Sequence, residues 1–144
     1  MEIGIQSLVQ YETFGHEADI GIRGFGNSVE EAFENAAKAL YSVMVNVNAV
    51  QPQTVRTVTA SASDVELLFI EWLNSLLTLT DLDRIFFSKF KVKLEGTFLH
   101  GTAWGESFNK VRHEPNVEVK GASYHLLSVK EENGRYVAQC VVDV

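Results

Sequence analysis

The sequence lacks most features of a secreted or membrane protein. Its one cysteine, Cys140, leaves no internal disulfide and no Cys-x-x-Cys motif. No apolar run approaches the roughly 20 residues that cross a bilayer. The first residues have neither the basic start nor the apolar stretch of a secretory signal. We therefore expect a cytoplasmic protein that does not enter a membrane.

Basic residues are also scarce. The chain has 12 Lys and Arg against 19 Asp and Glu, for a net charge of −7. RNA binding depends on clustered cations that release counterions from phosphates. The densest basic stretch, Lys89, Lys91 and Lys93, alternates along a strand-like segment, and we interpret it as an ordinary solvated sheet face. We expect a protein partner, a monomeric state, and contact with tRNA only through that partner.

Signatures of catalysis are missing as well. The sequence contains no Gly-x-Ser-x-Gly elbow, no phosphate-binding loop and no His-Glu-x-x-His. The four histidines share no spacing typical of zinc ligands, and we interpret each as a hydrogen-bonded structural residue: His16, His100, His113 and His125. These absences argue against an enzyme.

Two amphipathic helices are predicted. The first begins at Ser28, with Glu31 three residues later as a capping box, and its apolar residues then follow a 3.6-residue period to Met44. The second begins at Ser63, with Glu66 completing the same signal, and ends within residues 78–84. Its apolar face is so wide that it must be covered on more than one side. Trp72 on this face is expected in the core.

The remaining apolar segments predict strands, and Asn133-Gly134 predicts a hairpin between the last two. The expected strands are residues 9–14, 20–25, 54–60, 87–94, 97–104, 117–119, 124–130 and 136–144. Strands occur in runs instead of alternating with helices, which favours an α+β fold with two helices on mostly antiparallel sheet. At 144 residues, the chain fits one domain, 1–144, in which residues 1–10 form an extra strand or a less ordered end.

Two carboxylates are the main candidates for chemistry. Asp19 lies in a polar stretch just before the strand predicted at residues 20–25, and Asp143 lies one residue from the end of the chain, so Val144 adds a terminal carboxylate. If the two strands are neighbours, several oxygens converge, and such oxygens suit a hard cation such as Ca²⁺ or Mg²⁺. The alternative is that both carboxylates are solvated strand ends.

Several motifs, in this order along the chain, resemble the archease family. They include His16-x-Ala18-Asp19, the helix start at Ser28, Glu71-Trp72-Leu73-Asn74, Gly105-Glu106, His113, the segment from Val119 to His125, and Val142-Asp143-Val144. The resemblance covers residues 11–144. It departs from the family pattern at Glu17, Gly121 and Ser123, and none of these is a carboxylate of the candidate site.

The resemblance implies a function. Archeases are accessory proteins that activate RtcB-type RNA ligases in tRNA splicing, promoting ligase guanylylation and multiple turnover. It also implies a divalent cation, calcium first and manganese or magnesium as alternatives, at Asp19, Asp143 and Val144. The residues implied for docking or for support of the metal ligands are His16, Lys120, Tyr124 and His125.

Two alternatives remain open at this stage. One is a chaperone-like specificity modulator of a tRNA methyltransferase, which would share the fold and the metal site. The other is a small metal-dependent hydrolase that uses Asp19 and Asp143 as ligands. Only the hydrolase predicts turnover by the isolated protein.

Overall fold

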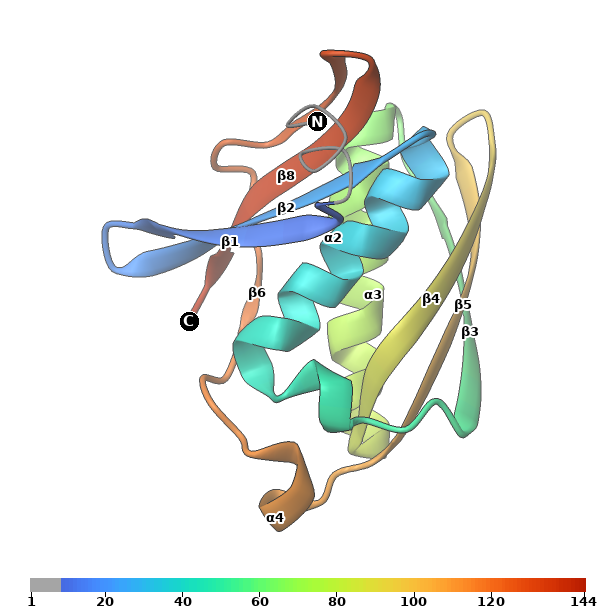
Figure 1. Ribbon diagram of the computed structural model, residues 1–144. Helices are drawn as coiled ribbons and strands as arrows, with labels where there is room; N and C mark the ends of the chain where they lie inside the picture. The colour runs from blue at the N-terminus through green and yellow to red at the C-terminus, as the bar shows by residue number, and fades with distance from the viewer. Residues whose placement is uncertain (1–8) are drawn as a thin grey trace, which may run out of the picture.

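Two antiparallel sheets enclose a pair of helices in the computed structural model, which describes residues 9–144 (Figure 1). The five-stranded sheet has the order β1-β2-β8-β6, and β7 also pairs with β8. Its strands are β1 (Tyr11–His16), β2 (Asp19–Gly26), β6 (Gly121–Ala122), β7 (Ser128–Glu132) and β8 (Arg135–Asp143). The three-stranded sheet has the order β3-β5-β4. Its strands are β3 (Thr54–Ser61), β4 (Ile85–Glu95) and β5 (Phe98–Ser107). The predicted α+β class is confirmed.

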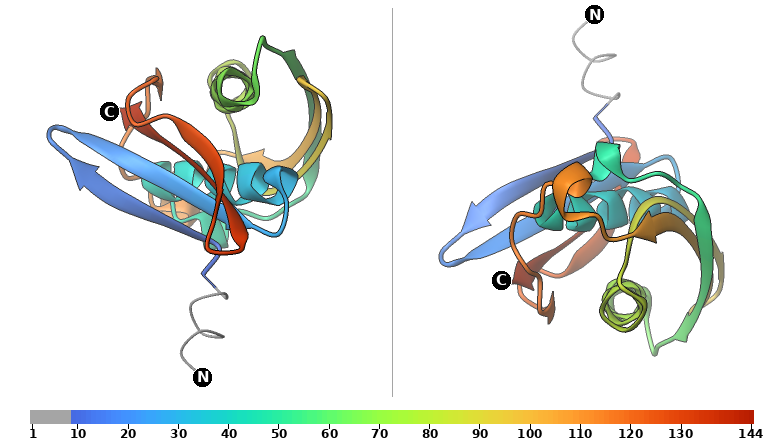
Figure 2. Two further views of the ribbon diagram at one scale, coloured as in Figure 1. Left: turned by 90° about the horizontal axis from the view of Figure 1, so that it is seen from above. Right: turned by 90° about the horizontal axis from the view of Figure 1, so that it is seen from below.

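The two long helices, α2 (Val29–Met44) and α3 (Val65–Asp83), lie between the sheets, and each contacts strands of both (Figure 2). This explains why the apolar face of α3 is so wide, as the sequence predicted. Two short helices, η1 (Val47–Ala49) and α4 (Lys110–His113), were not predicted. None of the helices in residues 9–144 is long and apolar enough to cross a membrane.

The start of α2 follows the predicted capping signal with one difference. The Ser28 hydroxyl accepts a hydrogen bond from the Glu31 N–H at 3.1 Å. The Glu31 carboxylate accepts from the Asn27 N–H instead of the Ser28 N–H. The helix then packs very closely on β2, because a Cβ at Gly24 would lie 2.2 Å from the Ala36 nitrogen. Only glycine fits there.

The predicted start of α3 was wrong by one residue. Asp64, not Ser63, is the N-cap, and its carboxylate accepts from the Leu67 N–H at 2.8 Å. An aspartate also adds a negative charge to the helix N-terminus, which stabilises it. Glu66, the expected partner of Ser63, accepts from the Val129 N–H instead. The helix ends at Asp83, as predicted, where Arg84 adopts a left-handed conformation.

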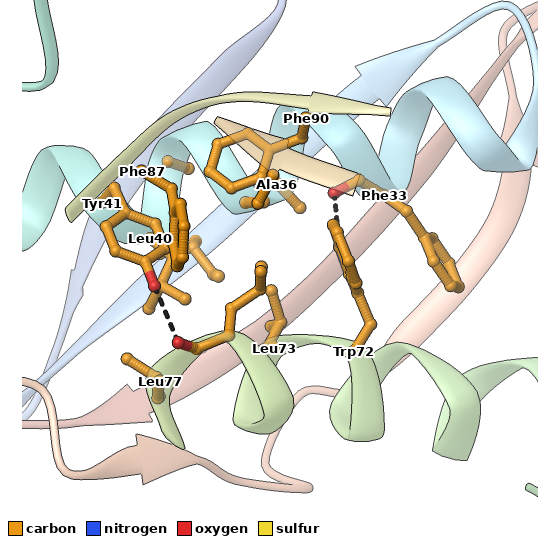
Figure 3. Packing of buried hydrophobic residues seen from close by; sticks show 14 of the residues in the cluster. Phe33, Ala36, Leu40, Tyr41, Trp72, Leu73, Leu77, Phe87 and Phe90 are labelled. Atoms are coloured by element: carbon orange, nitrogen blue, oxygen red, sulfur yellow. Dashed lines mark hydrogen bonds between the residues drawn. The ribbon is translucent and has the colours of Figure 1, made fainter. Parts of the chain in front are cut away.

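The core fills the space between the helices and the sheets (Figure 3). Trp72 is fully buried, as expected, and its Nε1–H donates to the Phe33 carbonyl at 3.1 Å. The buried Tyr41 hydroxyl lies 3.1 Å from the Leu76 carbonyl and 2.6 Å from the Thr80 hydroxyl. These bonds satisfy the polar atoms that the aromatic side chains carry into the core.

Two strand predictions were wrong. Residues 117–119 are not a strand, because the Val117 N–H donates to the Val43 carbonyl at the end of α2. Residues 124–127 form a turn in which Leu126 has a φ of 55°, so β7 begins only at Ser128. The hairpin at Asn133-Gly134 is confirmed, with both residues at positive φ. The sequence predicted an extra strand or a less ordered end over residues 1–10, and residues 1–8 lie outside the residues that the structure describes.

Candidate functional site

The two candidate aspartates lie at the same end of the five-stranded sheet. Strand β2 begins at Asp19 and its antiparallel neighbour β8 ends at Asp143, and their last paired residues are Ile20 and Val142. The Val144 N–H donates to Asp19 Oδ1 at 3.4 Å. The condition set by the sequence, that the two strands are neighbours, is therefore met. We call the corner formed by Asp19, Asp143 and Val144 the acidic corner.

A tight hairpin positions Asp19. Residues Glu17 and Ala18 form the turn between β1 and β2, with Glu17 at a φ of 53°, and His16 pairs directly with Asp19. A positive φ is uncommon for a residue with a side chain. This turn therefore fixes the histidine and the aspartate as cross-strand neighbours.

Strand β6 holds the end of the chain from the other side. The Lys120 N–H donates to the Asp143 carbonyl at 2.8 Å, and Gly121 pairs with Asp143. Helix α3 secures this strand, because Asn74 Oδ1 accepts from the Ala122 N–H at 2.9 Å. The backbone at Asp143 is thus paired while its side chain is exposed. The carboxylate is free to meet a ligand without loss of backbone structure.

A pair of histidines lies beside the acidic corner. The Nε2 atoms of His16 and His125 are 3.2 Å apart, and the rings meet edge to face with centroids 4.6 Å apart. A hydrogen bond at this distance requires one nitrogen to donate and the other to accept. No motif spacing indicated this contact, because the two residues are separated by 109 positions.

The turn that carries His125 is attached to β8 at Val141. The Val141 N–H donates to the His125 carbonyl at 3.0 Å, and the Ser123 hydroxyl donates to the Val141 carbonyl at 2.9 Å. Tyr124, on the same turn, is 68% exposed. Tyr124 and His125 therefore lie in an exposed turn and not in the strand predicted for residues 124–130.

The donors at the acidic corner are oxygen atoms. Carboxylate oxygens such as those of Asp19 and Asp143 suit a hard cation, not zinc or copper. Within residues 9–144, no group of three or more His, Cys, Asp or Glu side chains is placed to hold a metal ion. A cation here would therefore need the terminal carboxylate or water as further ligands.

Cys140 does not take part in this set. It is buried on the core side of β8, opposite Ile22. Burial, and to a smaller extent the charge of Asp143, raises the pKa of the Cys140 thiol to about 12. The thiol is fully buried and stays protonated at neutral pH, so it does not act as a nucleophile.

A second polar cluster lies near α4 and is structural. Glu106 is buried, and its carboxylate accepts from the Gln51 N–H and pairs with Arg112. His113 is fully buried, and its Nδ1 accepts a hydrogen bond from the Asn109 N–H. Its Nε2 lies 3.2 Å from Glu106 Oε2 but is not well aligned for a hydrogen bond. Burial works to raise the pKa of Glu106, but these partners together hold it below its usual value. The cluster ties α4 and the η1 loop to β5.

Comparisons with known proteins agree with the fold. The model of the Archease protein family matches residues 11–144. The chain is 42% identical over 142 residues to the protein archease of Pyrococcus abyssi, covering 95% of this chain and 100% of that protein. It is 39% identical over 139 residues to the protein archease of Sulfurisphaera tokodaii, with coverage of 95% and 100%.

Two solved structures have the same architecture. The solution structure of Methanobacterium thermoautotrophicum protein 1598 superposes with a TM-score of 0.78 at 34% identity, covering 93% of this chain and 98% of that one. The crystal structure of a Thermotoga maritima archease, described as a possible chaperone, superposes with a TM-score of 0.63. Its identity is 20%, with coverage of 92% and 96%, so it supports the fold alone.

Proposed function

The chain belongs to the archease family, and on this premise we propose that it is an accessory protein for an RtcB-type RNA ligase. It acts in tRNA splicing or RNA repair by promoting guanylylation and repeated turnover of the ligase. The observation that carries the proposal is the acidic corner, where Asp19 meets the chain end at Val144 beside the exposed Asp143.

The acidic corner has the properties that such a role requires. Ligase guanylylation needs a metal ion, a nucleotide phosphate and a histidine to be aligned, and a divalent cation neutralises phosphate charge during such a transfer. Asp19, Asp143 and the Val144 carboxylate would hold that cation, calcium first, with manganese or magnesium as alternatives. Asp143 offers its carboxylate from a sheet end that is fixed by Lys120 and Gly121.

The residues around the corner form the docking surface in this proposal. His16 and His125 present a polar ring pair, and Tyr124 offers a largely exposed aromatic side chain on the same turn. Exposed tyrosines contribute large contact areas to protein interfaces. Lys120 extends the surface on the side of β6. These side chains would bind the ligase around its active site, while the net charge of −7 weakens the attraction of the whole chain to RNA phosphates at physiological salt.

A second candidate, which the sequence resemblance left open, is a chaperone-like modulator of a tRNA methyltransferase. It uses the same corner with a different protein partner. A metal-dependent hydrolase has less support, because no third His, Cys, Asp or Glu side chain joins Asp19 and Asp143 among the described residues. The isolated chain is therefore proposed to have no turnover of its own.

The test is a ligation assay with the RtcB-type ligase of the same cell, GTP and a broken tRNA substrate. Substoichiometric amounts of the chain should restore multiple turnover, and Asp143→Ala should remove the activation while circular dichroism shows an intact fold. Glu131→Ala is the matched control, since Glu131 is an exposed carboxylate on β7. A folded Asp143→Ala protein that activates as well as the wild type would refute the role of the corner.

A further inference from the structure

The outer face of the three-stranded sheet differs from the rest of this acidic chain. Helices α2 and α3 lie on one side of β3, β4 and β5, and none of the described elements covers the other side (Figures 1 and 2). Lys89, Lys91 and Lys93 all point outward along β4, and each is exposed. Glu95 is the one carboxylate in this row. The lysines predicted to form a solvated sheet face thus lie on an uncovered sheet.

A column of aromatic rings lies directly beside the lysines. On β5, Trp104 pairs with Lys89 and His100 pairs with Lys93, so their side chains share the outer face. Phe98, 39% exposed, meets the His100 ring edge to face with centroids 4.9 Å apart. The Lys89 ammonium lies 4.9 Å from the centre of the Trp104 ring. These rings alternate along the sequence with buried residues, a period-2 signal that was readable without the structure.

Hydroxyl groups complete the surface. Strand β3 places Thr57 beside Thr102 and Thr59 beside His100 on the same face. The outer face therefore places lysines on β4, rings interrupted by Thr102 on β5, and hydroxyls with the exposed Val55 on β3, side by side. We call it the lysine–aromatic face. Lysines on an edge strand alone would be explained by protection against aggregation. That explanation does not account for the exposed rings in the central strand.

We propose that the lysine–aromatic face binds a short segment of single-stranded RNA. Sheets that bind single strands stack bases on aromatic side chains and hold the backbone with flanking cations. Residues two apart on a strand are about 6.8 Å apart, so the three lysines can follow successive phosphates while the rings accept unpaired bases. The threonine hydroxyls favour RNA over DNA, because a 2′-hydroxyl both donates and accepts hydrogen bonds. The proposal does not depend on the ligase or on a metal.

The face also predicts a limited affinity. Three phosphate contacts to a single strand give a slope of about −2 for log K against log salt concentration. With a net charge of −7 for the whole chain, binding should be measurable at low salt and weak at physiological salt. Duplex RNA, whose bases are already stacked, should bind less well than the single strand.

The experiment titrates the full-length chain against a short fluorescein-labelled oligouridine RNA at several low salt concentrations. Anisotropy reports binding, and quenching of tryptophan fluorescence reports stacking on Trp104, because Trp72 is fully buried. We expect saturable binding with quenching. Trp104→Leu should weaken binding by at least about fivefold, since stacking one base on an aromatic ring contributes at least about that factor.

Two lysine variants with equal charge changes provide the control. Lys91→Ala/Lys93→Ala should reduce the salt slope to about −0.7, and Lys110→Ala/Lys130→Ala should leave it unchanged. Of these four lysines, only Lys130 forms an ion pair within the described residues. All four are exposed, so both variants should fold. This pair keeps the test valid if Trp104→Leu does not fold.

Several outcomes would overturn the proposal. These are a lack of saturable binding at low salt, equal losses in the two lysine pairs, and oligodeoxythymidine or duplex RNA binding as tightly as the single-stranded RNA. The face would instead be a protein-docking surface if an acidic peptide displaced the RNA and bound the Trp104→Leu chain as tightly as the wild type. None of these outcomes bears on activation of the ligase, because the assay contains no ligase and none of the acidic corner is altered.

Discussion

Replacing Trp72 by alanine should cost this protein a large part of its stability. The side chain is fully buried between α2 and the three-stranded sheet. A Cβ at Gly101 would lie 2.3 Å from the ring atom Cζ3, so β5 fits closely around the indole. The ring also meets Phe90 edge to face at 6.2 Å and donates a hydrogen bond to the Phe33 carbonyl. Neither the helix nor the glycine can easily move to fill the space.

The magnitude follows from this packing. Large-to-small replacement of a buried aromatic residue costs about 3–5 kcal/mol, and total stabilities are about 5–15 kcal/mol. For a chain of this size, the midpoint of thermal unfolding should fall by about 10–17 °C. The loss of the Trp72 hydrogen bond, about 1 kcal/mol, is part of this figure.

Circular dichroism during urea unfolding measures the effect. The midpoint concentration should fall while the slope m stays unchanged, which identifies a change in stability and not in compactness. Trp104→Ala is the matched control, because Trp104 is half-buried on the outer sheet face and should lose about 1 kcal/mol or less. Equal losses in the two variants, or a loss below about 1 kcal/mol for Trp72→Ala, would refute the reasoning about the core.

Three further predictions concern ions, pH and RNA. Calcium at a hundred times its Kd should stabilise the chain by about 2.7 kcal/mol and raise its Tm. Asp19→Ala or Asp143→Ala should abolish this rise in Tm. If the wild-type Tm does not rise at millimolar calcium, the metal site is excluded. The lowered pKa of Glu106 contributes stability above the unfolded pKa of about 4.3, and this is lost as the pH falls through the folded pKa. Glu106→Gln should therefore reduce stability at pH 7 and flatten its decline in acid, as acid titration of unfolding will show. Intact tRNA should bind weakly at physiological salt, and a sub-micromolar Kd in a filter-binding assay would contradict this.

Local signals in the sequence predicted the elements that local chemistry determines. The apolar period placed both long helices, and Asn133-Gly134 placed the last hairpin because both residues tolerate a positive φ. The cap of α3 was misplaced because Ser63 and Asp64 are both good caps, and the structure selects the charged one. Neighbouring cap residues cannot be separated by propensity alone.

The errors arise where the backbone pairs with distant partners. Residues 117–119 are apolar and β-branched, but the Val117 N–H joins the end of α2 instead of a sheet. The contact between His16 and His125 depends on the turn fixed by Ser123 and Val141, which no local pattern records. The acidic corner was predicted only conditionally, since the pairing of β2 with β8 had to bring Asp19 to the end of the chain.

The pairing of β8 explains how the residues at its end, Asp143 and Val144, are held in place. Terminal residues are usually poorly ordered unless other elements hold them. Here β8 is a central strand, with β2 on one edge and β6 and β7 on the other. Asp143 is paired through its backbone with Lys120 and Gly121, and the Val144 N–H reaches Asp19. The sheet pairs Asp143 only through its backbone, so the Asp143 carboxylate is not needed for that pairing. An exposed charge on a fixed backbone is an arrangement that a metal or a partner protein can use.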